Sequence, residues 1–301
     1  MNWAIQQLLS GVLLGGYYAL LASGLSFMFG VMRIINLAHG DLAIVGACLV
    51  FLLADTTDVS PFVALILVLP IMAAIGWGLQ RWMLERSLRA GMLVPLLTTF
   101  GLAIVLENGL FEYFGADTRS LAPYIGDFGF DSWAINSDVY VGSLAVLIFA
   151  VAVLLLGGLK LFLTYTSLGR EIRATAEDPD TAELCGIDSR SVYAIAAAIS
   201  VASAGLAGVF LAMRATFTPF SGPEQLIFAF EAVVIGGIGS LSGTLVGGIV
   251  LGVAQTFGAQ INPQGFLITG HVVFLAVLAA RLALGGLRAR GGVHRFFIRR
   301  P

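Results

Sequence analysis

Long apolar runs, separated by short polar stretches, make up most of this chain. A helix needs about 20 predominantly apolar residues to cross a bilayer. Runs of about this length predict membrane-spanning helices at residues 8–29, 61–80, 93–114, 139–163, 192–213, 241–259 and 266–284.

Two further apolar runs, 42–54 and 226–238, are shorter. As helices they would be about 20 Å long, which is too short to cross a hydrocarbon core of about 30 Å as independent spans. Both lie beside glycine-rich or polar sequence, which predicts broken or re-entrant helices. Counting the first of these runs as a span, the pattern predicts an all-α integral membrane protein with about eight transmembrane helices and broken or re-entrant segments.

The two short runs also suggest an internal repeat. One lies in "NLAHGDLAIVGACLV" and the other in "FAFEAVVIGGIGSLSGTLVGG". Each combines a short apolar segment with glycines, and twofold internal repeats are common in transporters. We therefore expect two weakly related halves.

The composition agrees with lipid as the main solvent. Hydrophobic residues make up 58% of the 301 residues and charged residues only 11%, with a mean hydropathy of +0.94. Soluble domains carry about 25% charged residues, so a water-soluble fold of this size is excluded. We expect one polytopic domain over residues 1–301. Its first apolar run is predicted to be a retained helix, because "MNWAIQQ" lacks the basic region of a signal peptide.

Basic residues concentrate in the loops 81–92 and 164–191 and at the C-terminus. The other loops carry one basic residue, Arg119, and span residues 55–60, 115–138 and 215–225. Because basic loops stay in the cytoplasm, this bias predicts a cytoplasmic C-terminus. The N-terminal segment carries no charged side chain that would indicate on which side of the membrane it lies.

Three polar residues, Asn36, His39 and Asp41, flank Gly40 at predicted membrane depth. Buried ionisable groups are costly there and normally face a cavity or one another. They either cap a helix break, with His39 and Asp41 paired, or line the translocation path; the two hypotheses are compatible. The three histidines lack the spacing of metal ligands, so no metal site is predicted.

Two acidic residues, Glu107 and Glu231, also lie within apolar runs. Each either makes a helix–helix hydrogen bond or lines the path, and Arg33 is a candidate partner for a carboxylate. The glycines after Glu231, among them Gly236, Gly237 and Gly239, either pack helices closely or form the turn of a re-entrant segment.

The loop 164–191, "TYTSLGREIRATAEDPDTAELCGIDSRS", is the longest polar piece between two spans. It predicts a short amphipathic helix that is broken near Pro179, with a new helix beginning at Asp188 or Ser189. It is either a solvated connection or a docking helix for a soluble partner.

Several motifs together identify a family. "MRIINLAHGDLAIVGA", "RATAEDPDTAELCGID", "AAAISVASAGLAGVF" and "AVVIGGIGSLSGTLVGGIVLG" resemble, in this order, the permease subunit of branched-chain amino acid ABC transporters. The resemblance runs from about Leu13 to Leu284. One departure is Asp41, where the family commonly has glutamate.

The resemblance implies a bacterial inner-membrane importer with several subunits. Two related permeases pair in the membrane, two cytoplasmic ATPases drive them, and a periplasmic protein delivers the solute; no nucleic acid is involved. Residues 168–187 would be the cytoplasmic coupling helix. Its candidate ATPase-coupling residues are Arg170, Arg173, Glu177, Asp178, Ala182 and Gly186.

The sequence contains no G-x-x-x-x-G-K-[ST] phosphate loop. We therefore expect no enzyme and no cofactor in this chain, with ATP and Mg²⁺ bound by partner subunits. Leucine, isoleucine and valine are the expected solutes, and urea, amides or aromatic and other carboxylates are the alternatives. A proton-coupled transporter using His39, Asp41, Glu107 and Glu231, and a hydrolase using Ser242 and His271, are competing hypotheses.

Overall fold

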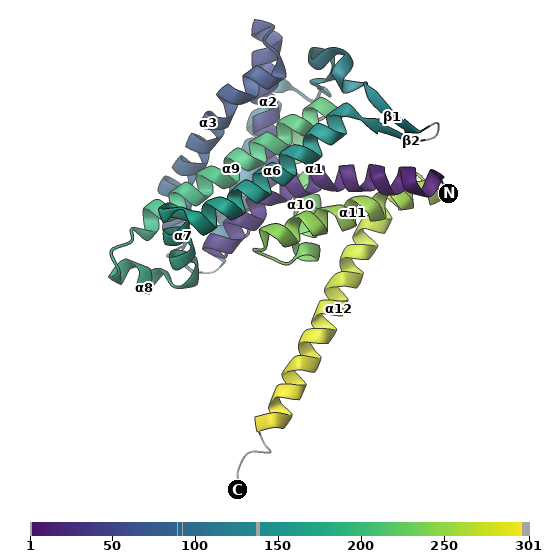
Figure 1. The fold of residues 1–301 in the computed structure, drawn as a ribbon. Coiled ribbons are helices and arrows are strands. Elements are labelled where there is room, and N and C mark those ends of the chain that lie inside the picture. The colour runs from purple at the N-terminus through teal and green to yellow at the C-terminus, as the bar shows by residue number, and fades with distance from the viewer. Residues whose placement is uncertain (1, 89, 92, 137–138, 297–301) are drawn as a thin grey trace.

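The computed structural model describes all residues except 1, 89, 92, 137–138 and 297–301. Eight of its helices are long and apolar enough to cross a membrane, which confirms the predicted all-α membrane fold (Figure 1). They are α1 (Asn2–Met32), α2 (His39–Thr57), α3 (Pro61–Leu79), α5 (Val94–Phe114), α6 (Ser143–Tyr165), α9 (Ser189–Arg214), α11 (Leu241–Ile261) and α12 (Gly265–Phe296).

Shorter elements connect these helices. A π-helical turn, Gln80–Leu84, continues α3 into α4 (Glu85–Leu88), and 3₁₀ turns cover Ala122–Gly129 and Pro219–Ser221. The remaining elements are the hairpin of β1 (Ser132–Asn136) and β2 (Val139–Gly142), and the helices α7 (Ser167–Glu177), α8 (Pro179–Leu184) and α10 (Gly222–Gly236).

Three boundaries differ from the sequence predictions or refine them. The run 42–54 was predicted to be too short to cross, which is wrong: α2 has 19 residues, because it begins at His39 and includes the polar positions. The run 226–238 does form a short helix, the 15-residue α10. The predicted span 139–163 begins at Ser143 instead, because residues 139–142 pair with β1.

Helix α1 lies at the centre of the bundle and packs closely on α11 through glycines. A methyl group on Gly15 would lie 2.4 Å from the Cα of Ile249, and one on Gly252 would lie 2.4 Å from the carbonyl oxygen of Gly11. Such small residues let two helix backbones approach within van der Waals contact. The predicted packing role of the glycines in α11 is therefore confirmed.

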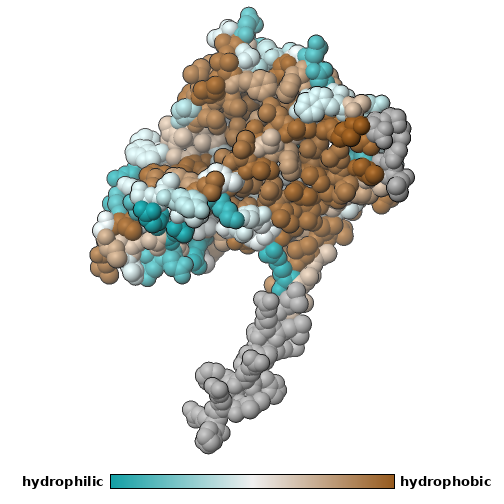
Figure 2. Space-filling model, viewed as in Figure 1, coloured by the Kyte–Doolittle hydropathy of each residue, from teal (hydrophilic) through white to brown (hydrophobic). Residues whose placement is uncertain are grey.

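The predicted grouping of the loops is also confirmed. Glu85 and Arg190 form an ion pair of 3.2 Å, which joins the two basic loops at one end of the bundle, called here the basic end. At the opposite end, Tyr124 donates a 2.8 Å hydrogen bond to Asp55, and Arg119 pairs with Phe217 through the backbone. In Figure 2 a continuous hydrophobic surface separates polar surface at the two ends.

The N-terminus, whose side the sequence left open, lies at the opposite end. Trp3 contacts Gln260 at the end of α11, and Gln6 donates a hydrogen bond of 3.1 Å to the carbonyl of Tyr140 in β2. The last described helix, α12, leaves the bundle and projects away from it (Figure 1). The side chains of the C-terminal arginines lie outside the described residues.

Candidate functional site

The chain between α1 and α2 runs back into the bundle. His39, the first residue of α2, places its Nε2 2.8 Å from the carbonyl oxygen of Leu21. Leu21 precedes the end of α1 at Met32 by about 16 Å of helix. Helix α2 therefore begins deep in the bundle, and the non-helical residues 33–38 run from the end of α1 to that depth. Such backbone requires hydrogen-bond partners within the protein.

Side chains supply these partners. Asn36 Oδ1 accepts a hydrogen bond of 3.0 Å from the N–H of Ala38, and Thr99 Oγ1 on α5 accepts one of 3.1 Å from the N–H of Leu37. Because a carbonyl oxygen only accepts, Nε2 of His39 carries the proton that it donates to Leu21. Asn36 therefore satisfies a backbone group at the helix break, as predicted, whereas His39 binds a carbonyl within α1 and not one at the break.

The predicted pair of His39 and Asp41 is wrong, because His39 is directed to α1 instead. Asp41 is buried, and its Oδ1 has no hydrogen-bond partner among the described residues. It contacts Gly222, the first residue of α10: a methyl group on Gly222 would lie 1.8 Å from this oxygen. The carboxyl group of Asp41 therefore lies where the N-termini of α2 and α10 meet.

Replacing Asp41 by asparagine tests this arrangement. Helix N-termini attract negative charge, and each such interaction contributes about 0.3–1 kcal/mol, or up to about 2 kcal/mol when partly buried. Since the first turns of two helices lie beside the carboxyl group of Asp41, we expect Asp41→Asn to lower the free energy of unfolding by about 1–2 kcal/mol and to reduce transport. The loss of stability is measured as the thermal midpoint in detergent. An unchanged midpoint together with full transport would show that the carboxylate is incidental.

Helix α10 is held in place by polar contacts from two other helices, α12 and α1. Glu231 is buried and lies 2.5 Å from Nδ1 of His271 on α12, and Arg281 on α12 donates a hydrogen bond of 2.8 Å to the carbonyl of Ile235. The hydroxyl of Tyr17 on α1 donates one of 2.6 Å to Gln225. The reading of Glu231 as a helix–helix hydrogen bond is therefore confirmed.

The acidic residues of the predicted proton relay do not form one chain. Glu231 lies nine residues along α10 from Gly222, which corresponds to about 13 Å from the contact with Asp41. Glu107 lies on α5 and is half-buried. Arg33, the candidate partner of a carboxylate, has no ion pair within the described part of the chain.

A glycine turn reverses the chain between α10 and α11. Gly237 and Gly239 have φ angles of +105° and +79°, in the region that favours glycine. A methyl group on Gly236, the last residue of α10, would lie 2.0 Å from the carbonyl oxygen of Gly243. Both predictions for this run therefore hold: the glycines form the turn of a short segment and pack two helices closely. Whether they line a path stays a prediction.

The loop at the basic end has the predicted form. Asp178 breaks the helix before Pro179 and caps α8, accepting hydrogen bonds of 3.1 Å from the N–H groups of Asp180 and Thr181. Asp188 caps α9 in the same way through the N–H of Arg190. Both pKa values are lowered: that of Asp178 chiefly by the Thr181 hydroxyl, and that of Asp188 chiefly by the Ser191 hydroxyl.

The two faces of this loop differ. Ile172, Thr175 and Ala182 are buried, so Ala182 fixes α8 to the bundle and is absent from the outer surface. The other candidate coupling residues are exposed: Arg170, Arg173, Glu177, Asp178 and Gly186. Sequence reasoning missed Leu184, which is 89% exposed at the end of α8. The sequence did contain a signal for it: Leu184 follows Ala182 by two residues, about half a helical turn, and so lies on the opposite face of the helix.

The cap of α8 can be tested through the native thiol beside it. Cys185 is exposed and Cys48 is buried, so a nitroxide attaches preferentially to Cys185. We expect Asp178→Ala to increase the mobility of this label, with Asp180→Ala as a matched control that removes no cap. Because folding lowers the pKa of Asp178 below its ordinary value of 3.8, the ionised cap stabilises α8 above pH 3.8. The same loosening should appear in the unmutated chain as the pH falls below this value, and its absence would contradict the capping role.

Comparison with known proteins identifies the family. A profile described as "Branched-chain amino acid transport system / permease component" matches residues 7–282. The chain belongs to this permease family. It is 35% identical to the high-affinity branched-chain amino acid transport system permease protein BraD of Pseudomonas aeruginosa over 85% of this chain and 87% of that protein.

Two permease proteins of Escherichia coli also match this permease. LivH is 30% identical over 83% of this chain and 84% of that protein, and LivM is 28% identical over 87% of this chain and 66% of that protein. Both are called high-affinity branched-chain amino acid transport system permease proteins. Together with the eight apolar helices, these relatives show a multi-pass inner-membrane transport subunit, which is not an enzyme.

The geometry of Ser242 and His271 contradicts the hydrolase hypothesis, as does membership of a permease family. Ser242 Oγ lies 3.1 Å from Nζ of Lys160, which donates to it, whereas His271 binds Glu231. A nucleophilic serine requires a base within hydrogen-bond reach. In this permease the two residues have other partners, so the structure contradicts the pairing.

Proposed function

We propose that this permease forms the translocation path of an ABC importer for branched-chain or other hydrophobic amino acids. Separate cytoplasmic ATPases drive it, and a periplasmic binding protein delivers the solute. The basic end and the C-terminus face the cytoplasm, as the bias of arginine and lysine predicts. The names of BraD, LivH and LivM support the solute class.

The observation that carries the ATP-driven role is the exposed face of α7 and α8. A conformational change in a soluble partner reaches a membrane subunit only through a surface that both share. Here a short capped helix pair is fixed by buried Ile172 and Ala182, and it presents Leu184 with charged neighbours to the solvent. The support comes from the position of Leu184 on this fixed helix pair, since single apolar residues are common on protein surfaces. The sequence contains no phosphate loop, which supports the proposal that separate ATPase chains bind the ATP.

A related but different permease is the proposed membrane partner. Escherichia coli has both LivH and LivM as permease proteins, and this chain is similar to each. Helix α5 is largely exposed in the single chain, since only Pro95 and Thr99 of its residues are buried. It also exposes Asn108, a polar group that is costly in contact with lipid. A second permease against α5 would remove this cost.

The solute is set largely by the binding protein in systems of this kind, so urea, amides and aromatic or other carboxylates stay alternatives. The proton-coupled hypothesis is weaker, because its four residues do not form a continuous chain. Uptake driven by ATP at zero proton gradient would support the ABC role. Uptake that follows the proton gradient and needs no ATPase would contradict it.

The first experiment is a gentle purification of the tagged chain, with mass spectrometry of the proteins that remain bound. We expect two ATPase chains and a second permease. The purified complex, placed in vesicles with the binding protein, should take up labelled leucine when ATP is present on the side of the basic end. A chain that purifies alone under several mild detergents and transports without ATP would overturn the proposal.

A further inference from the structure

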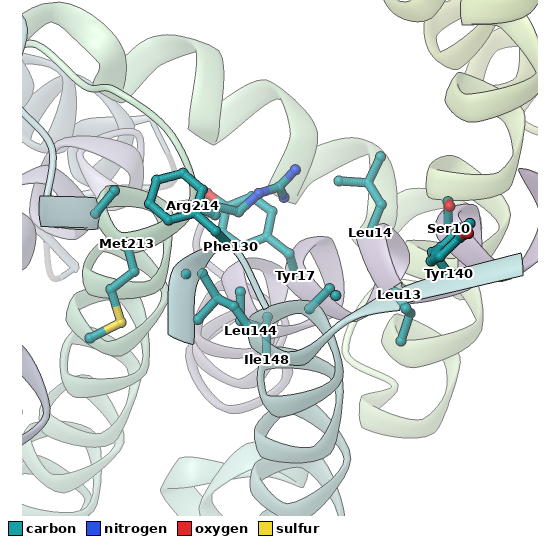
Figure 3. A pocket seen from close by; sticks show the side chains of 14 residues that line it. Ser10, Leu13, Leu14, Tyr17, Phe130, Tyr140, Leu144, Ile148, Met213 and Arg214 are labelled. Atoms are coloured by element: carbon teal, nitrogen blue, oxygen red, sulfur yellow. The ribbon is translucent and has the colours of Figure 1, made fainter. Parts of the chain in front are cut away.

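A cavity of about 300 Å³ lies at the opposite end of the bundle, between α1, the start of α6, the hairpin and the end of α9 (Figure 3). It is separate from the helix break and from the loop at the basic end. Its walls combine apolar side chains such as Leu14, Leu144 and Ile148 with the polar groups of Ser10, Tyr140 and Arg214. Mostly apolar walls with a few polar groups are typical of small-molecule sites, and this volume is at the lower end of their range.

Among the residues that the structure describes, Arg214 is the one charged residue that lines the cavity. Its guanidinium carbon lies 4.8 Å from the ring centroid of Tyr17. Within the described residues, no hydrogen bond or ion pair occupies its N–H groups. Stacking on an aromatic face leaves the N–H edge of a guanidinium open to a planar, bidentate acceptor, and a carboxylate fits this geometry.

The back wall of the cavity contacts the short helix α10. Tyr17 is buried, and its hydroxyl bonds to Gln225 in the first turn of α10. Gln225 lies three residues after Gly222, which contacts Asp41 at the helix break. An occupant that touches Tyr17 therefore lies one side chain away from the place where α2 and α10 begin.

We propose that this cavity binds a small monocarboxylate with an apolar tail. The carboxylate binds the N–H edge of Arg214, and the tail packs against Leu144 and Ile148. This site rests on the proposed function, because the proposed orientation places the cavity on the side from which the solute arrives. It is the first contact of the solute with the membrane subunit, next to the start of the re-entrant helix.

The test is a binding measurement on the full chain in lipid nanodiscs, with its co-purifying membrane and ATPase subunits and without any soluble binding protein. Labelled leucine is the probe. We expect 4-methylpentanoate, which keeps the carboxylate and lacks the ammonium group, to compete with it. Leucinamide, which lacks the carboxylate, should not compete. Equal competition by leucinamide, or no saturable binding, would overturn the proposal.

Two variants locate the site. Arg214→Gln should weaken binding about tenfold or more, because it removes a charge-assisted bidentate hydrogen bond. Ala145→Trp should abolish binding by filling the cavity that Ala145 lines. The matched control is Ala74→Trp, which places the same side chain in an apolar surface groove on α3 beside Trp82. Unchanged binding in Ala145→Trp, or equal loss in Ala74→Trp, would contradict the assignment.

An acyl chain of a lipid is the other possible occupant, and it would need only the apolar walls. In that case Ala145→Trp would reduce binding and Arg214→Gln would leave it unchanged, and this result would overturn the carboxylate site. The uptake assay separates this proposal from the proposed function. Normal ATP-driven uptake in chains that show no leucine binding would remove the cavity site and leave the importer role intact.

Discussion

Replacing Gly40 by alanine should abolish transport and sharply reduce the yield of folded protein. A methyl group on this residue would lie 1.9 Å from the carbonyl oxygen of Gly222 and 2.9 Å from the backbone N of Leu226. Both atoms belong to backbone, so a side-chain rotation cannot relieve the overlap. Overpacking of a dense interior costs about 1–3 kcal/mol, and a backbone clash lies at the upper end of this range.

The expected effect is large because of where the contact lies. Gly40 joins the N-termini of α2 and α10, so separating them also disturbs Asp41 and the bond between His39 and Leu21. The matched control is Gly157→Ala in α6, where a methyl group would meet no atom within 4 Å. This change should be neutral or slightly stabilising, since alanine favours a helix over glycine by about 1 kcal/mol. Fluorescence-detected size exclusion gives the folded yield, and equal yields for both variants would show that the contact has no structural importance.

Replacing Leu184 by aspartate should uncouple the permease from its ATPases while leaving the permease folded. Leu184 is 89% exposed, so the single chain loses no packing when it is changed. If Leu184 inserts into a pocket of the ATPase, a buried charge replaces an apolar anchor. Truncating such an anchor costs about 2 kcal/mol or more, which corresponds to a loss of at least about tenfold in ATPase retention.

The control for this variant is Ile261→Asp. Ile261 is 88% exposed at the end of α11, at the opposite end of the bundle. The same charge there should leave ATPase retention unchanged. Retention is measured after washing the tagged complex, and uptake is measured in vesicles. Glu177→Lys and Gly186→Trp on the same exposed face should act in the same direction as Leu184→Asp. Full retention in all three would rule out α7 and α8 as the docking surface.

Hydrophobic periodicity and charge were sufficient to predict the elements that depend only on neighbouring residues in the sequence. Apolar runs of about 20 residues marked the spans, basic residues grouped the loops correctly, and Asp178 and Asp188 marked two helix caps. The same rules placed the start of α2 about three residues late. They treat His39 and Asp41 as too polar for a membrane helix, whereas in the fold both are enclosed by α1 and α10.

The candidate site was predicted as a set of residues and not as an arrangement. His39 and Glu231 were identified as polar groups that need partners, but their partners, Leu21 and His271, lie far along the sequence. Thr99, which accepts a hydrogen bond from Leu37 at the break, is equally remote, and no local pattern connects these pairs. The cavity is built partly by Tyr17, which lies within an apolar run, and by Arg214, which ends another. Nothing in the sequence marks either residue as part of a site. Only the fold places the guanidinium group of Arg214 over the ring of Tyr17.

The sequence by itself determined that this chain is an all-α membrane permease, because hydrophobic length, loop charge and family motifs are local properties. Only the tertiary structure decided which polar groups pair, since a buried group bonds to whatever the packed helices bring within about 3 Å. It also decided which of two similar glycines has room for a side chain: Gly157 does, whereas Gly40 lies against the backbone of α10.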